Sequence, residues 1–212
     1  MKKMIMVLGG VLLLASCNTK TTTVTEVAHE VTGGINAEII PFDFKETTAE
    51  ADLIAHLTIR NQVEEAKVVK GRSIPYTLFN AEVKEVYKGE VTTKEIVIKQ
   101  EGDSEWVVNN SKLFEAGEEY ILFLKKTAEI RGDFWIIGAE TGTFRVLDQD
   151  TVAKLLMPIA ELKDIEVVAS KRDPKVDSLI DELNDNGKEI QMINKDKLIG
   201  KIKAEENGKK DN

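Results

Sequence analysis

Alternating apolar and polar positions dominate the central part of the chain and predict a series of β-strands. From Leu53 to Ile59 every second residue is apolar, and His56 falls among the polar residues of the opposite face. We therefore expect His56 to be a half-exposed strand residue rather than a ligand. A second strand is expected over residues 74–87, where the apolar phase slips after Val83 as it does at a β-bulge.

Further strands are expected along the chain. Ile96 and Ile98 mark the third, and the run from Tyr120 to Leu124 is apolar on both faces, which predicts the most buried strand. Shorter strands over residues 134–137 and 143–147 complete the β region. No helical crossover long enough to connect parallel strands separates these segments, so the pattern predicts an antiparallel sandwich or barrel.

A short helix is expected before the first strand, and more helix after the last. The spacing of Thr47 and Glu50 is that of a capping box, which predicts a helix from about Thr48 to Asp52. We therefore predict a mainly β fold with a short N-terminal helix and a C-terminal helical appendage.

The C-terminal appendage shows mixed patterns. Asp150 is placed to cap a short helix through Leu156, whereas residues 160–170 leave an extended segment open as an alternative. The Asp-Pro pair at residues 173–174 predicts the start of an amphipathic helix that ends at Gly187.

The N-terminus has the parts of a secretory signal. Lys2 and Lys3 precede an apolar run that ends at Leu14 and is too short to span a bilayer. The following Ala-Ser-Cys, ending in Cys17, resembles the lipoprotein signal that bacterial signal peptidase II cuts. In that family the matching cysteine receives a diacylglyceryl thioether, and its freed amine is often acylated as well. An ordinary signal with a chance cysteine is the alternative.

The chain thus divides into five expected segments. They are a signal peptide (residues 1–16), a Thr-rich flexible tether beginning at the lipidated Cys17 (17–36), a β-barrel domain (37–148), the α-rich appendage (149–204) and a charged, disordered tail (205–212). This organisation places the protein in the cell envelope, outside the cytoplasm and held to the membrane by lipid. Which membrane holds it is left open.

Charge and cysteine content exclude several function classes. Without Lys2 and Lys3 the chain holds 27 basic against 37 acidic residues, a balance of −10, which argues against binding nucleic acid or anionic lipid head groups. Cys17 is the only cysteine, so its acylation would leave no thiol for disulfides, metal ligation or catalysis. We expect no cofactor and no metal.

The β region also resembles a known kind of domain. The resemblance rests on Tyr76, Phe79, the run 83–89, Ile96–Ile98, Phe114, Gly117, the run 119–124, Gly142, Phe144 and Val146. Together these residues resemble an uncharacterised domain of bacterial exported proteins, with an OB-like barrel similar in pattern to netrin-type and tissue-inhibitor-of-metalloproteinase domains.

That resemblance covers about residues 51–148 and implies a fold more than a function. The cysteines of netrin-type domains are absent here. The tissue inhibitors chelate their target's zinc through a free N-terminal cysteine, whereas Cys17 is expected to be acylated at the end of a tether. Inhibition by that mechanism is therefore not implied.

Few residues suggest catalysis. Phosphate loops, nucleophile elbows and His-Glu-x-x-His motifs are absent, and the chain has two histidines. Paired carboxylates are the remaining candidates: Glu64 with Glu65, Glu118 with Glu119, and Asp103 with Glu105.

Two tryptophans are candidates for ligand contact. Trp106 is the stronger one, because packing does not readily explain an indole within the polar loop expected over residues 101–111. Trp135 alternates with core residues, so covering the barrel would account for it. By analogy with OB barrels, the loops at residues 64–73 and 101–111 would flank a binding face.

These patterns favour a non-catalytic binding or scaffold module that recognises an envelope protein or a glycan. An inhibitor of an envelope hydrolase is the alternative drawn from the resemblance. A weak hydrolase that uses surface carboxylates such as Asp103 and Glu105 is the other alternative.

Overall fold

A computed structural model describes residues 33–35, 43–66, 74–109, 111–127, 134–138, 141–155, 158–167, 177 and 190–208. The signal, Cys17, most of the tether and the helix expected over residues 173–187 lie outside this part of the chain, apart from the helical Asp177. The elements are β1 (Gly33–Ile35), α1 (Phe44–Glu50), β2 (Leu53–Ala66), β3 (Tyr76–Lys88), β4 (Glu95–Glu101), β5 (Trp106–Val108), β6 (Glu119–Lys126), β7 (Phe134–Ile136), β8 (Thr143–Val146), β9 (Thr151–Leu155), the 3₁₀ helix η1 (Ala160–Ile165), β10 (Ile190–Asn194) and α3 (Lys195–Gly208).

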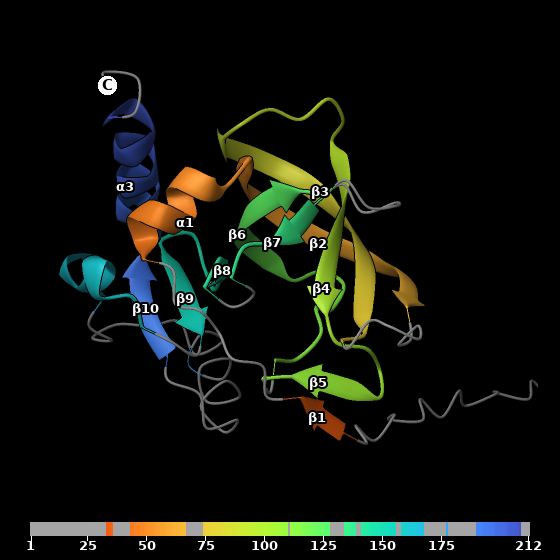
Figure 1. The fold of residues 1–212 in the computed structure, drawn as a ribbon. Helices are drawn as coiled ribbons and strands as arrows, with labels where there is room; N and C mark the ends of the chain where they lie inside the picture. Colours follow the sequence, from red (N-terminus) through yellow and green to blue (C-terminus); the bar gives the residue numbers. More distant parts are fainter. Residues whose placement is uncertain are drawn as a thin grey trace, which may run out of the picture.

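Five strands close into a barrel in the order β2-β3-β4-β7-β6 and back to β2 (Figure 1). The short strand β7 completes the ring, because it pairs with β4 on one side and with β6 on the other. The mainly β class is therefore confirmed. The expectation of a purely antiparallel barrel is wrong at one junction, since β4 and β7 run parallel. A closed five-stranded barrel is compatible with an OB-like fold.

The barrel interior is apolar, as the alternation along β2 predicts. Leu53 and Leu57 point inward and are fully buried, whereas His56 faces outward. The predicted bulge is also present: Glu85 pairs with His56 and Val83 with Leu57, which leaves Lys84 as the extra residue between them. The residues that fill the interior are Leu53, Ala55, Leu57, Ile59, Phe79, Ala81, Ile96, Ile98, Phe114, Tyr120, Leu122, Leu124, Phe134 and Ile136.

A second core covers the outer face of β2 and β6. Ile121 and Phe123 of β6 point away from the barrel and are fully buried beneath α1, α3 and η1, together with β8, β9 and β10, which extend the sheet (Figure 1). Phe44 of α1 packs edge-on against Phe123, with ring centroids 6.0 Å apart. The predicted burial of residues 120–124 on both faces is thus confirmed, and its cause is that β6 separates two cores.

The helix expected from Asp150 to Leu156 is wrong, because residues 151–155 form strand β9. Asp148 accepts hydrogen bonds from the backbone N–H groups of Asp150 and Thr151, at 2.8 and 2.7 Å, and so turns the chain from β8 into β9. Val152 and Ala153 then pair between β8 and β10 and are fully buried. Hydrogen-bonded pairing with a strand on each side of residues 151–155 outweighs the helix-capping pattern at Asp150.

Several other boundaries differ from the predicted ones. Helix α1 begins at Phe44, where the Asp43 carboxylate caps the N–H of Glu46 at 2.5 Å, and it ends before Asp52. The expected tether ends in strand β1, which pairs in parallel with β5. Residues 160–165 form a 3₁₀ helix rather than an extended segment. The expected disordered tail begins inside α3, which continues to Gly208.

Because β6 is common to both cores, we expect the two halves of the fold to unfold together. Ile121→Ala opens the second core and Leu122→Ala opens the barrel, and each should lower the free energy of unfolding by about 2–5 kcal/mol. Urea titrations followed by tryptophan fluorescence, which reports on Trp135 of the barrel strand β7 and on Trp106 of the β1–β5 pair, and by far-ultraviolet circular dichroism would test this. Val63→Ala, at a half-exposed position, is the control. A fluorescence transition unmoved by Ile121→Ala would contradict the coupling.

Candidate functional site

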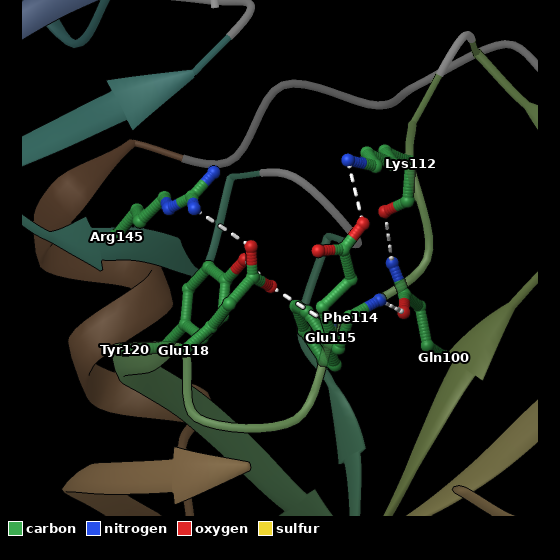
Figure 2. A network of polar contacts seen from close by, with 7 residues as sticks. All are labelled: Gln100, Lys112, Phe114, Glu115, Glu118, Tyr120 and Arg145. Carbon is green, nitrogen blue, oxygen red and sulfur yellow. Dashed lines mark hydrogen bonds and ion pairs between the residues drawn. The ribbon is translucent and has the colours of Figure 1, made fainter. Parts of the chain in front are cut away.

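The carboxylate of Glu118 is the centre of a polar network at one end of the barrel (Figure 2). It forms an ion pair with Arg145 of β8 at 2.7 Å and accepts hydrogen bonds from the Tyr120 hydroxyl at 2.7 Å and from the N–H of Glu115 at 2.9 Å. The side chains of Glu118 and Arg145 are largely buried. With these donors around it, Glu118 holds the segment before β6 against the barrel end.

The side-chain amide of Gln100 fastens the neighbouring segment of the same barrel end. Its Nε2 donates to the carbonyl of Lys112 at 3.0 Å, and its Oε1 accepts from the N–H of Phe114 at 2.9 Å (Figure 2). Phe114 can therefore pack between Phe79 and Tyr120, with ring centroids 5.6 and 4.6 Å away. These hydrogen bonds and the ion pair close this end of the barrel. The polar groups of the network therefore bind one another and the backbone.

The candidate pair Glu118 and Glu119 is separated by the alternation of β6. Glu119 faces away from the Glu118 network and contacts the Nε2 of His56 at 2.9 Å, with the Thr58 hydroxyl at 3.5 Å. The two carboxylates therefore do not converge on one site. His56 is a strand residue on the outer face of β2, as predicted, but it is more buried than the half-exposed position we expected, since its side chain retains 14% of its accessible surface.

The other carboxylate pairs also have structural partners. The side chain of Asp103 accepts from the N–H groups of Glu105 and Trp106, at 2.9 and 2.8 Å, and so builds the turn that leads into β5. Asp103 is buried, with 4% of its surface accessible. Glu65 accepts from the Ser104 hydroxyl at 2.9 Å, which joins the end of β2 to this turn. The end of β2 is therefore in contact with the expected loop at residues 101–111, whereas residues 67–73 of the other expected loop lie outside the described part of the chain.

Trp106 lies on strand β5, in a segment whose polar sequence predicts a loop, and it is 40% exposed. Its indole covers the backbone of Gly33 in the parallel partner strand β1, where a Cβ atom would overlap the ring. Packing against Gly33 therefore explains the buried part of the Trp106 indole. Its role in ligand contact stays a prediction.

Trp135 stands at the centre of a second exposed feature, on the outer face of β7. Its neighbours Phe134 and Ile136 point into the barrel, so the indole points outward, with 40% of its surface accessible. Lys99 of β4 and Lys125 of β6 are its direct cross-strand partners and flank it on the same face.

Tyr76 of β3 extends this surface beyond Lys99. The Lys99 ammonium lies 4.4 Å from the centroid of the Tyr76 ring, in the range of a cation–π contact. We call Tyr76, Lys99, Trp135 and Lys125 the aromatic–lysine face. Two carboxylates border it: Glu101 pairs with Tyr76 across the strands, and Glu50 forms an ion pair with Lys125 at 2.5 Å.

Comparisons with known proteins do not assign the chain to a family. No model of a protein family matches it, and no curated protein is significantly similar to it in sequence. Within the described residues, no three His, Cys, Asp or Glu side chains are grouped so that they could hold a metal ion. No helix in that same part of the chain is long and apolar enough to cross a membrane.

The two buried tyrosines make stability depend on alkaline pH. Burial, and next the negative charge of Glu118, raise the pKa of Tyr120 well above its usual value near 10; burial and Glu85 likewise raise the pKa of Tyr87. The folded state therefore keeps these protons more strongly than the unfolded chain does. The contribution of the two protonated tyrosines to the free energy of unfolding is therefore complete below about pH 10, and it is lost as the pH rises above that value.

We therefore expect the free energy of unfolding to fall steeply above about pH 10, and the fall to be shallower for Tyr120→Phe. Urea titrations at several alkaline pH values would measure both slopes, and phenolate absorbance would show when each tyrosine ionises. Tyr76→Phe is the control, since Tyr76 lies on the outer face of the barrel. Equal slopes for wild type and Tyr120→Phe would contradict this assignment.

Proposed function

We propose that this protein is a lipid-anchored, non-catalytic binding module of the bacterial cell envelope. In this proposal Cys17 carries the lipid, the chain up to β1 is the link to the membrane, and the barrel is the ligand-binding domain. The observation that carries the binding role is the exposed aromatic–lysine face on the outside of the closed barrel.

The strand arrangement supports an OB-like reading of the barrel. Along the chain its strands follow in the order β2, β3, β4, β6 and β7, and around the ring β7 lies between β4 and β6. OB-type barrels bind their ligands on the face of the second and third strands. Those are β3 and β4 here, which contribute Tyr76 and Lys99.

The occupied carboxylates favour binding over hydrolysis. General acid–base catalysis needs a carboxyl group that faces the substrate with a suitably shifted pKa. Asp103 is buried in a turn, and Glu118 is held by Arg145 and Tyr120. An inhibitor of an envelope hydrolase also belongs to the binding class, and the resemblance of the sequence pattern is its only support.

The binding role predicts a partner that depends on Trp135. We would cross-link tagged wild type, Trp135→Ala and Trp106→Ala in intact cells and identify what is retained, whether protein or glycan. Wild type and Trp106→Ala should retain the same partner, and Trp135→Ala should lose most of it, because the indole supplies the exposed apolar contact. Loss in Trp106→Ala alone would move the site to β5. Recovery of lipid and background alone from wild type would count against a binding module.

The lipid anchor makes a separate prediction. Two or more acyl chains are needed for stable membrane attachment, and each buried CH₂ contributes about 0.8 kcal/mol. Cys17→Ser should therefore move most of the protein from the membrane fraction to the soluble extracytoplasmic fraction. Mass spectrometry of the wild-type N-terminus should show an acylated Cys17. An unmodified Cys17 would contradict the anchor.

A further inference from the structure

The aromatic–lysine face combines an apolar platform with a balanced set of charged groups. Trp135 offers its exposed indole between two lysine side chains on strands to either side. The two positive charges, Lys99 and Lys125, are matched by the carboxylates of Glu50 and Glu101 at the two ends of the face. The surface therefore has hydrogen-bond donors and acceptors around an aromatic ring, without an excess of either charge.

Both lysines are already held in place by this surface. Lys99 is positioned over the Tyr76 ring. Lys125 donates to Glu50 at 2.5 Å, and that hydrogen bond raises the pKa of Lys125 and keeps its ammonium charged. A polyanion would have to compete with Glu50 for Lys125 and would also meet the negative charge of the whole chain, −8. Electrostatics thus argues against an acidic ligand.

Sugar hydroxyl groups suit such a surface because each can both donate and accept a hydrogen bond. The apolar side of a pyranose ring can stack on an exposed indole, while its hydroxyls reach ammonium donors and carboxylate acceptors at the rim. Lys99 and Glu101 lie two residues apart on the same face of β4, and so offer a donor and an acceptor side by side.

We propose that the aromatic–lysine face binds a neutral, hydroxyl-rich glycan, with one sugar ring stacked on Trp135. This inference rests on the proposed binding function and names its ligand class. It predicts binding that depends on the aromatic ring at position 135 and hardly on ionic strength, because no net charge is neutralised on binding.

Affinity electrophoresis and calorimetry with soluble polysaccharides would test this, using the full chain with Cys17→Ser. The neutral probes are dextran, a mixed-linkage β-glucan and a galactomannan; the acidic probes are polygalacturonate and alginate. We expect at least one neutral probe to bind with an affinity that is unchanged between about 50 and about 500 mM salt. Trp135→Ala should weaken it at least roughly tenfold, and Trp135→Tyr should retain most of it.

Controls separate loss of binding from loss of folding. Trp106→Ala removes an equally exposed indole outside the aromatic–lysine face, at the position for which the sequence predicts ligand contact. It distinguishes the two sites: a glycan that stacks on Trp135 should bind this variant like the parent chain. Urea titration should show that Trp135→Ala is folded. In a Trp106→Phe background the single remaining tryptophan reports directly, and its emission should shift when the neutral glycan binds. If Trp135→Ala does not fold, the inference is still tested by two results: the glycan affinity of Trp135→Tyr and the emission shift of Trp135 in the Trp106→Phe background.

Two results would overturn the inference. Binding of only the acidic probes, with an affinity that falls steeply with salt, would leave a glycan-binding module but the wrong ligand class. Failure of every neutral probe to bind in a Trp135-dependent way would remove the glycan. If no neutral glycan binds but cross-linking in cells captures a partner, the proposed binding function stands and the glycan inference fails. If cross-linking captures no partner either, both the binding function and the glycan inference fail.

Discussion

Two hydrophobic cores share strands β2 and β6, and the rest of the structure depends on this. Within β2, Leu53 faces the barrel and Ile54 faces the second core; within β6, Leu122 and Ile121 do the same. Each strand is therefore buried on both sides, which removes these positions from any contact with solvent or ligand. The aromatic–lysine face therefore lies on β3, β4 and β7 and on Lys125 near the end of β6, at positions that the second core does not cover.

Closure of the barrel by β7 places the exposed indole. A strand of three residues bridges β4 and β6, and its outer two side chains, Phe134 and Ile136, are anchored in the interior. The middle residue, Trp135, then has only one direction left, which is outward between Lys99 and Lys125. A rigid scaffold under a single exposed ring is the arrangement that a preorganised binding surface needs.

Several buried polar side chains of the barrel and its loops form hydrogen bonds with backbone groups that have no strand partner. Gln100 binds one carbonyl and one N–H of the segment it faces, as a neighbouring strand would, and Asp103 satisfies two N–H groups of a turn. Buried polar groups need such partners, because an unmade hydrogen bond in a core costs about 1–3 kcal/mol. The carboxylates that look like catalytic candidates in the sequence therefore include groups on which the fold itself relies.

Alternation and apolar runs depend only on neighbouring residues, so the sequence alone could predict several features. These are the strands of the barrel, the outward position of His56, the bulge near Lys84 and the burial of β6 on both faces. Strand partners depend on residues far apart in the chain. The parallel contact of β4 with β7, the strand at residues 151–155 and the row that joins Tyr76 to Trp135 were therefore decided by the tertiary structure. Sequence favoured Trp106 for its polar surroundings, whereas only barrel closure brings Trp135 between two lysines.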